Sequence, residues 1–275
     1  MALLGSLLGA PVEREDLKVK EGRRTTRARG CDRSAIVKVF PTEHWARKVA
    51  ERIRAVEGGQ REPEVSHVLA LWPRLRTVVL SDVPGVSLRS ALRANDASEC
   101  ERAGAAIGRW HLVHSGLPPL PLRAHTVQRE IDVLRWRAEG APPEVRSRAL
   151  AAASGLAAPW GCTTAVHRDL QDEHVLMYRG VGLIDLDNVA AGPPELDIGN
   201  FVAQVERQEV RTKANYQPAL NALLRGHSAQ GPPLEPELAE RCRKLALLRL
   251  ACLHGDPRLI DLSERGWTWP GKQGG

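Results

Sequence analysis

The sequence predicts an α+β fold of two lobes, a small antiparallel sheet followed by a mainly helical part. Residues 1–83 contain several short runs rich in β-branched residues and one amphipathic helical segment. Residues 84–275 have the periodicity of helices, interrupted by a strand-rich stretch at 163–188. The chain has 275 residues, enough for two lobes around a cleft with a sizeable core. We therefore expect two domains that meet at a hinge near 81–86.

The N-terminal lobe is expected to hold one helix among its strands. The helix begins after Thr42, whose side chain suits the N-cap, and ends before the glycine pair at 58–59. The segment at 34–40 alternates β-branched residues and places Lys38 among apolar neighbours. The predicted strands lie at 16–22, 34–40, 65–73 and 75–85.

The C-terminal lobe is expected to begin with a helix opened by a capping box, in which Ser98 pairs with Glu101. Within 163–188, three short strands are predicted, and Arg179 with Gly180 forms a tight turn between the last two. This hairpin brings two acidic motifs together, "HRDLQDEH" at 167–174 and "GLIDLDNVAAG" at 182–192. Further helices are predicted at 126–139, 144–157, 197–210, 215–226 and 236–253.

The net charge of +6 raises the question of a nucleic-acid partner. Basic residues are spread over the whole chain, and only "RRTTRAR" at 23–29 is concentrated. Aromatic residues make up 4% of the chain, too few for a base-stacking platform. Nucleic acid is therefore not the expected partner, although the pI of 9.3 keeps a basic nucleic-acid-binding protein as an alternative.

The cysteines and the apolar segments indicate a cytoplasmic protein. The five cysteines are far apart and form no C-x-x-C pair, which argues against a disulfide framework and a zinc site. The first 16 residues carry a short apolar run without a basic segment before it, so we expect a packing segment rather than a signal peptide. No later stretch has the roughly 20 apolar residues of a membrane helix, so no membrane partner is expected.

Three aspartates are predicted to meet at the edge of the hairpin. Close carboxylates repel unless a cation lies among them, and Mg²⁺ is usually held by one or two carboxylates together with substrate phosphates. Asp185 and Asp187 end a strand, which makes them candidate metal ligands for a phosphorylated ligand. Asp169 lies inside a loop, where a carboxylate can accept the proton of an attacking hydroxyl or orient it.

These motifs resemble those of a known family. "HRDLQDEH" resembles the kinase catalytic loop H-R-D-L-x-x-x-N except at its last position, which is His174. There is no D-F-G and no A-P-E. Instead, "GLIDLDNVAAGPPELDIGNF" resembles the pattern of the aminoglycoside phosphotransferase and choline kinase-like family, with Asp197 as its closing aspartate. The resemblance covers about residues 16–254 and implies a bilobal protein-kinase-like fold with a catalytic hairpin.

The resemblance implies an ATP-dependent transfer of the γ-phosphoryl group to a hydroxyl of a small molecule, such as an aminoglycoside, a sugar or an amino alcohol. It implies ATP with Mg²⁺, or Mn²⁺, as the cofactors and a monomer or homodimer as the working form. Asp169 would be the catalytic residue. Lys38 would hold the nucleotide phosphates. The hinge backbone at Ser81, Asp82 and Val83 would hold the adenine.

Two positions of the site leave alternatives open. The glutamate that orients Lys38 is expected on the first helix, where we prefer Glu51 to Glu57. His174 offers nitrogen, which suits Zn²⁺, Mn²⁺ or iron better than Mg²⁺. It could bind the metal through water, or leave the metal mainly to Asp185 and Asp187, which we prefer because the second acid offsets a lost ligand. An impaired site would make the protein a catalytically silent nucleotide-binding scaffold.

The regions that would contact phosphate and acceptor are less typical of the family. The segment "KEGRRTTRARGCDR" offers only Gly22 and Gly30, so a phosphate cradle there would depend on backbone and arginine. From residue 197 onward the chain has 9 acidic and 11 basic side chains. This balance favours a neutral or anionic acceptor over a polycation, while a role in antibiotic resistance stays open.

Overall fold

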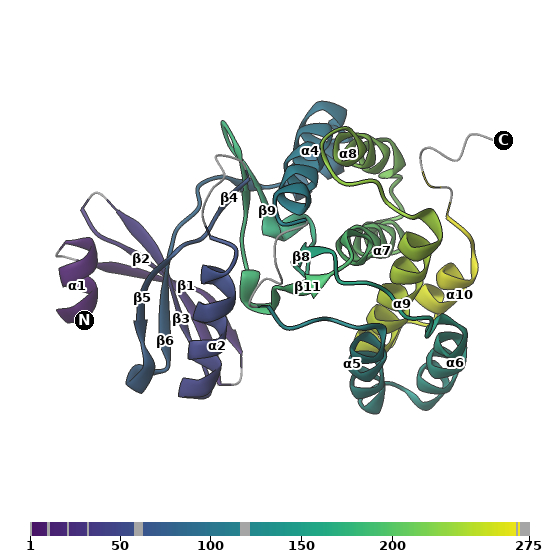
Figure 1. The fold of residues 1–275 in the computed structure, drawn as a ribbon, viewed down its shortest axis with the longest axis horizontal. Helices are drawn as coiled ribbons and strands as arrows, with labels where there is room; N and C mark the ends of the chain where they lie inside the picture. Colours follow the sequence, from purple (N-terminus) through teal and green to yellow (C-terminus); the bar gives the residue numbers. More distant parts are fainter. Residues whose placement is uncertain are drawn as a thin grey trace.

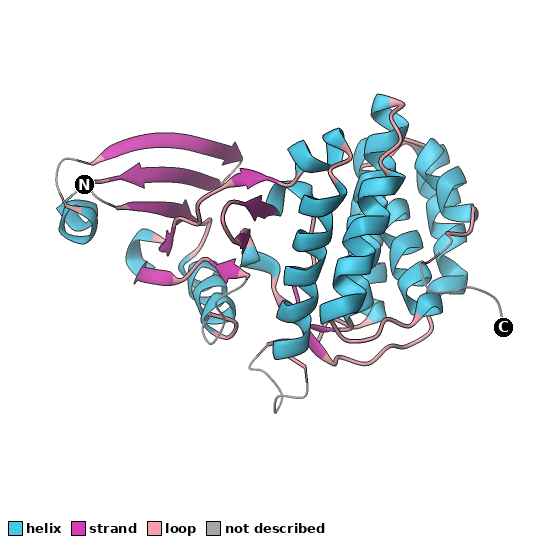
Figure 2. Cartoon of the chain, turned by 90° about the horizontal axis from the view of Figure 1, so that it is seen from above, coloured by secondary structure: helices cyan, strands magenta, loops and turns pink. Residues whose placement is uncertain are grey.

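The computed structural model describes residues 2–9, 12–20, 22–31, 33–57, 63–115, 122–267 and 269. Most of its strands gather in one half of the molecule and most of its helices in the other, as Figures 1 and 2 show. The predicted α+β architecture, with an antiparallel sheet followed by a mainly helical part, is therefore confirmed. Among the described residues, no helix is long and apolar enough to cross a membrane.

The N-terminal sheet has five antiparallel strands in the order β1-β2-β3-β6-β5. The four predicted strands each overlap one of these strands. The basic run at 23–29 was not among the predicted strands, but it forms β2, which pairs with β1 on one side and β3 on the other. The strands are β1 (Glu13–Lys20), β2 (Arg23–Arg29), β3 (Ser34–Val39), β5 (Val68–Trp72) and β6 (Thr77–Ser81).

Strand alternation gives β3 two different faces. Ala35 and Val37 pack in a small core with Leu4 and Leu8 of helix α1 (Ala2–Leu8), so the N-terminal segment is a packing segment as predicted. Ile36 and Lys38 lie on the opposite face, toward α2 and the helical lobe. The alternation therefore directs the Lys38 side chain between the lobes.

Helix α2 (Glu43–Arg54) covers this inner face of the sheet. The hydroxyl of Thr42 accepts a hydrogen bond from the backbone N–H of Trp45 at 3.2 Å, which confirms Thr42 as the N-cap. Val49 and Ile53 are fully buried on one side of the helix, while Glu51 is exposed on the other. The amphipathic pattern thus fixes which α2 side chains can reach the cleft.

A second, four-stranded sheet joins the two lobes in the order β4-β10-β9-β7. The predicted hairpin forms its centre, with β9 and β10 antiparallel and Tyr178 to Gly180 in the turn. The strands are β4 (Glu64–Val65), β7 (Val86–Ser87), β9 (Val175–Met177) and β10 (Val181–Leu183). Chain segments on both sides of the predicted hinge therefore pair with the hairpin, and the domain boundary at 83/84 stays a prediction.

The predicted strand at 163–166 belongs to a different sheet from the hairpin. It forms β8 (Thr164–Val166), which pairs with β11 (Ala190–Gly192) in a two-stranded sheet. The loop with Asp169 follows β8, and Asp185 and Asp187 follow β10. The two acidic motifs therefore meet between two small sheets, whereas a single sheet edge was expected.

The helical lobe contains eight α-helices among the described residues. The first long one begins at Ala97 rather than at Ser98, because the carboxylate of Asp96 accepts a hydrogen bond from Glu99 N and forms the N-cap. The short helices α3 and α10 were not predicted. The helices are α3 (Arg89–Ala94), α4 (Ala97–Val113), α5 (Val127–Glu139), α6 (Pro143–Ala153), α7 (Pro194–Thr212), α8 (Gln217–Gln230), α9 (Pro236–His254) and α10 (Arg258–Glu264).

Helices α4 and α8 lie side by side at one edge of this lobe (Figure 1). A Cβ added at Gly104 would lie 1.9 Å from the carbonyl oxygen of Leu223. A Cβ added at Gly226 would lie 2.0 Å from the carbonyl oxygen of Glu101. Two glycines, one from each helix, therefore allow a backbone contact that no larger residue permits.

Candidate active site

A cavity of about 240 Å³ lies between the N-terminal sheet and the catalytic hairpin. Its walls come from both lobes, since strands β1, β2, β3 and β6 form one side and the segment from Glu173 to Asp185 contributes the other. The lining residues are Leu17, Lys18, Thr25, Arg27, Ile36, Lys38, Ser66, Leu80, Asp82, Val83, Glu173, His174, Leu176, Ile184 and Asp185. Apolar walls with charged groups at one end suit a ligand with a flat apolar part and an anionic part.

Lys38 stands at the charged end of this cavity and bridges two carboxylates. Its Nζ donates to Oδ1 of Asp185 at 2.6 Å and to Oδ1 of Asp187 at 2.7 Å. Lys38 is only 7% exposed, and burial alone would lower the pKa of its ammonium. The charges of Asp187 and Asp185 outweigh burial and hold this pKa above its ordinary value. Lys38 is therefore a fixed cation, and its predicted role in holding nucleotide phosphates stays a prediction.

Asp187 is the more deeply buried of the two carboxylates and holds the lobes together. Its Oδ2 accepts a hydrogen bond from Nη2 of Arg23 at 2.6 Å, and its carbonyl oxygen accepts one from Nη1 of Arg52 at 2.9 Å. Both arginines come from the N-terminal lobe. The Arg23 guanidinium also lies 5.3 Å from the ring centres of Phe40 and Trp45, which fixes its position.

The structure does not place Glu51 at Lys38, so the predicted pairing is wrong. Glu51 is exposed on α2, and the partners of Lys38 are the two aspartates. The alternative, Glu57, accepts a hydrogen bond from the backbone N–H of Val68 at 2.7 Å. The apolar stripe of α2 turns Glu51 to solvent, and aspartates after β10 take the place of the expected helix glutamate.

His174 has one nitrogen held by the backbone and one directed to the carboxylates. Its Nδ1 donates to the carbonyl oxygen of Asp169 at 2.7 Å, so Nε2 carries the free lone pair. Nε2 lies 3.5 Å from Oδ2 of Asp185 and 3.2 Å from Nε2 of Gln171. Burial, reinforced by the neighbouring His167 ring, lowers the pKa of His174. The imidazole is therefore neutral near pH 7 and can act as a ligand.

Asp169, His174 and Asp185 each place one potential ligand atom within 4.8 Å of the others. Asp185 has its pKa lowered, because the charge of Lys38 outweighs the effect of burial, so it is ionised. Asp187 does not belong to this group, because both of its carboxylate oxygens are bound to Lys38 and Arg23. These ion pairs argue against the expectation that a metal depends mainly on Asp185 and Asp187, with His174 set aside, and that expectation stays a prediction.

The carboxylate of Asp169 is half-buried and has no hydrogen-bond partner among the described side chains and backbone groups. The loop that carries Asp169 is held in place by Asp197 of α7. The carboxylate of Asp197 accepts hydrogen bonds from His167 N at 2.6 Å and Arg168 N at 2.7 Å. His111 of α4 contacts the same carboxylate at 3.1 Å. The loop backbone is therefore rigid, while the Asp169 side chain is left for a ligand.

Two non-glycine residues of the acidic motifs have left-handed backbone conformations. Arg168 has φ of 67° and Asp185 has φ of 64°. Such conformations are disfavoured for residues with a Cβ and persist where surrounding contacts enforce them, often at functional sites. Arg168 directly precedes Asp169, and Asp185 itself lines the cavity, which supports a built site.

The predicted hinge residues differ in their access to the cavity. Asp82 and Val83 line it, and the Asp82 carboxylate accepts a hydrogen bond from Nε of Arg27 at 2.8 Å. Ser81 does not line it. The Ser81 backbone N–H donates to His67 O and its hydroxyl accepts from His67 N, so Ser81 is fully used in pairing with the neighbouring strand. A hinge contact is therefore limited to Asp82 and Val83.

Sequence reasoning missed the roles of the arginines in β2. Every arginine side chain of this strand donates a hydrogen bond to a carboxylate. Arg23 contacts Asp187, Arg24 contacts Asp16, Arg27 contacts Asp82 and Arg29 contacts Glu15. The concentration of arginine opposite acidic β1 residues was the available signal, because residues across a hairpin face each other. The basic run is thus largely neutralised within the protein.

Comparisons with known proteins agree with this geometry. The family model described as "Phosphotransferase enzyme family" (APH) matches residues 19–240. Among curated proteins, no sequence matches the chain. Solved structures of low sequence identity share the fold.

A choline kinase from Cryptosporidium parvum Iowa II has a TM-score of 0.67 at 10% identity, with 95% of this chain and 91% of that chain covered. The aminoglycoside phosphotransferase APH(3'')-Id from Streptomyces rimosus has a TM-score of 0.62 at 18% identity, covering 92% and 96%. The macrolide 2'-phosphotransferase MphH from Brachybacterium faecium has a TM-score of 0.59 at 13% identity, covering 95% of both chains. The family match spans more than half of the sequence, and the chain belongs to the APH phosphotransferase enzyme family.

Proposed function

We propose that this protein is an ATP-dependent phosphotransferase that moves the γ-phosphoryl group to a hydroxyl of a small molecule. The observation that carries the proposal is the position of the Asp169 carboxylate. It has no hydrogen-bond partner among the described residues, is held on a rigid loop and lies next to the Lys38–Asp185 pair. Family membership supports the reaction class. A structurally similar enzyme, APH(4)-Ia, was solved as a ternary complex with ADP and hygromycin B, at 14% identity and a TM-score of 0.57.

The cavity between the lobes is the proposed nucleotide site. The base would lie against Ile36, Leu80 and Val83, and its polar edge would face the backbone at Asp82 and Val83. Lys38 at the charged end would contact the phosphates, since its ammonium is fixed and desolvated. Arg23, at the start of β2, would add a second cation where a glycine-rich turn is missing.

The donor set of Asp169, His174 and Asp185 fits a divalent cation that accepts mixed oxygen and nitrogen ligands. Asp185 and His174 would hold it, with Mn²⁺ or Mg²⁺ as the ions that a nucleotide site uses. When bound, such an ion neutralises charge on the nucleotide phosphates. Asp187 would serve the site indirectly, because it positions Lys38 and Arg23.

Asp169 is the proposed catalytic residue. Its carboxylate would orient the acceptor hydroxyl and accept its proton as the oxygen attacks the γ-phosphorus. The oxygen–phosphorus bond to the acceptor forms while the bond to the ADP leaving group breaks. The hydrogen bonds from His167 N and Arg168 N to Asp197 keep the loop in place during this step.

An ADP-release screen tests this proposal. Purified protein with ATP and either Mg²⁺ or Mn²⁺ is assayed against aminoglycosides, sugars, sugar phosphates, amino alcohols and nucleosides. At least one acceptor should raise ADP release above the Asp169→Asn protein by about 10²-fold or more. If every compound leaves the wild type at the level of that variant while ATP still binds, the protein is a nucleotide-binding scaffold rather than an enzyme.

A further inference from the structure

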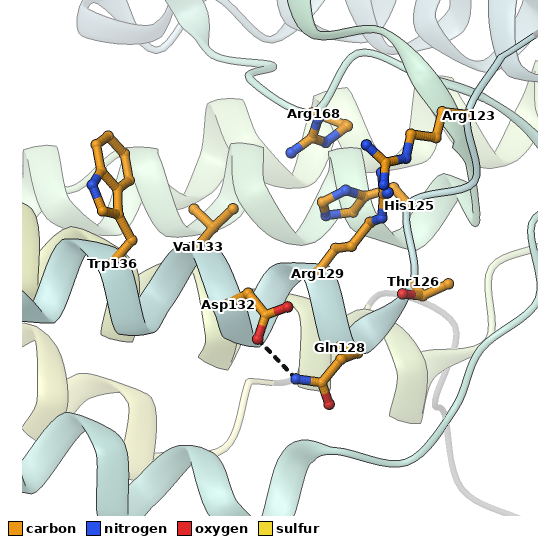
Figure 3. Close-up of a pocket in the computed structure, with 9 residues that line it drawn as sticks. All are labelled: Arg123, His125, Thr126, Gln128, Arg129, Asp132, Val133, Trp136 and Arg168. Atoms are coloured by element: carbon orange, nitrogen blue, oxygen red, sulfur yellow. Dashed lines mark hydrogen bonds between the residues drawn. The ribbon is translucent and has the colours of Figure 1, made fainter.

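A second hollow, of about 640 Å³, borders the catalytic loop at Arg168, whereas the proposed nucleotide cavity borders it at Glu173 and His174. Figure 3 shows it between helix α5 and the loop, with Arg168 on one side and Arg123, His125 and Arg129 on another. It is more open than the nucleotide cavity. Its lining residues are Arg123, His125, Thr126, Gln128, Arg129, Asp132, Val133, Trp136 and Arg168.

This hollow adjoins the loop that carries the proposed catalytic residue. Arg168, in its wall, directly precedes Asp169 in the chain. The Asp169 carboxylate also acts on Arg137, the neighbour of Trp136, whose pKa is lowered by burial and by the charge of Arg249. The hollow therefore lies beside the loop that carries Asp169.

The arginines of this hollow have no carboxylate partners. Arg123 and Arg129 form no ion pair or side-chain hydrogen bond with any described residue. Arg168 donates only a long bond of 3.4 Å to the carbonyl oxygen of Asn188, and its buried Nε has no hydrogen-bond partner within the described ranges. A buried donor without a partner is costly unless a ligand supplies the acceptor.

The acidic groups nearby are already used by other cations. Glu130 of α5 is buried, and its carboxylate accepts one hydrogen bond from Arg249 at 2.7 Å and contacts His125 at 2.8 Å. Asp132, the one acid in the lining, is bound by Arg135 and Gln128. Among the described residues, no ion pair therefore neutralises the three arginines of the wall, while the charges of Glu130 and Asp197 act on Arg168 from a distance.

We propose that the acceptor of this phosphotransferase is an anionic hydroxyl compound, whose phosphate or carboxylate group binds Arg123, Arg129 and Arg168. This inference rests on the proposed function, because it assigns the substrate class of the same active site. Guanidinium groups match such oxyanions with paired N–H donors, and they repel the ammonium groups of a polycation. Val133 and the exposed Trp136 would offer an apolar face to a sugar or polyol carbon skeleton.

Calorimetric binding without nucleotide tests the site independently of turnover. The probes are matched sets on one skeleton: glucose, glucose 6-phosphate, glucuronate and glucosamine, together with glycerol and glycerol 3-phosphate. At least one anionic probe should bind about tenfold or more tightly than its neutral match, and the binding should weaken with salt. The phosphate and carboxylate arms show which oxyanion is preferred. Equal binding of anionic and neutral probes, or preference for glucosamine, would overturn the proposal.

The variant Arg123→Gln/Arg129→Gln identifies the pocket responsible. These side chains are exposed or half-buried, so thermal unfolding should show a folded protein. Binding of the anionic probe should fall by about tenfold or more, whereas the control Arg146→Gln, an exposed arginine of α6, should bind like the wild type. Unchanged anion binding in the double variant would refute the site.

Turnover with the same probes separates this inference from the proposed function. ADP release with a neutral or amine acceptor, unaffected by the double variant, would support the phosphotransferase and overturn the anionic acceptor. Arginine-dependent anion binding without ADP release from any compound would support the anion site and refute the enzyme. ADP release with an anionic acceptor, lost together with its binding in the double variant, supports both.

Discussion

The two hollows that border the catalytic loop differ in whether their charged side chains form ion pairs. At the proposed nucleotide cavity, ion pairs connect the two lobes. Lys38 pairs with Asp185 and Asp187, and Arg23 pairs with Asp187. On the α5 side, the arginines of the hollow meet no carboxylate among the described residues. Paired charges position groups and stabilise the protein, whereas unpaired charges mark the place where a ligand supplies the opposite sign.

The largest expected effect comes from a residue on the loop that borders both hollows. Asp169→Asn should lower acceptor-dependent ADP release by about 10²- to 10⁴-fold, because an amide cannot accept the proton of the hydroxyl. The Asp169 carboxylate has no partner among the described residues, so the unfolding temperature should stay close to that of the wild type. A large loss of stability in this variant would mean that the residue is structural.

The paired side predicts a large loss of stability. Asp187→Asn removes the charge that Lys38 and Arg23 share, and we expect the free energy of unfolding to fall by about 4 kcal/mol in urea titrations. The control Glu51→Gln alters an exposed α2 carboxylate and should change it by no more than about 0.5 kcal/mol. A large loss of stability in Glu51→Gln with little change in Asp187→Asn would show that Lys38 pairs with Glu51 rather than with Asp187.

Glu130 tests the ion pairs that stand behind the unpaired arginines. Burial would raise its pKa, but the charge of Arg249 and the His125 hydrogen bond lower it from 4.5 to about 2. As the pH falls, Glu130 therefore binds a proton in the unfolded state before it does so in the folded state. The stability that the ionised Glu130 contributes is lost between about pH 4.5 and pH 2.

Glu130→Gln should accordingly lower the free energy of unfolding at pH 7 by about 3 kcal/mol and flatten its dependence on pH below 4.5. The exposed Glu139 at the end of the same helix provides the control Glu139→Gln, which should leave both quantities almost unchanged. An unaltered pH profile in Glu130→Gln would show that its carboxylate is not stabilised by Arg249.

The smallest expected effect concerns the metal. His174→Asn replaces a nitrogen ligand with an oxygen ligand, which should shift the ratio of Mn²⁺-supported to Mg²⁺-supported ADP release toward Mg²⁺ by about tenfold. The unfolding temperature with each ion and a nonhydrolysable ATP analogue should shift in the same direction. An unchanged preference by both measurements would remove His174 from the ligand set.

The fold was largely predictable because its signals are local. Thr42 and the apolar spacing of α2 predicted that helix, and Arg179 with Gly180 predicted the hairpin turn. Strand β2 was missed because arginine and threonine fill it, and it is stabilised by acidic residues across β1. The start of α4 was displaced because Asp96, which precedes Ser98 and is an equally good cap, accepts the hydrogen bond from Glu99 N.

The candidate site was predictable only where a motif keeps its residues together. Asp169 and Asp185 were assigned within their motifs, and the alternation of β3 indicated Lys38. The partners of Asp187 could not be predicted, since Arg23 lies 164 positions away and depends on how the lobes meet. The predicted pairing of Glu51 with Lys38 was wrong for the same reason, because helix spacing shows which face of α2 is polar but not what that face approaches.

The formation of a phosphate ester tests the central claim most directly. Phosphorus-31 NMR of the protein with ATP, a divalent cation and the acceptors that raise ADP release should show a new ester resonance that grows with the ADP signals. The account predicts this resonance with the wild-type protein and its absence with Asp169→Asn. Release of inorganic phosphate alone, or an ester that forms equally well with Asp169→Asn, would contradict it.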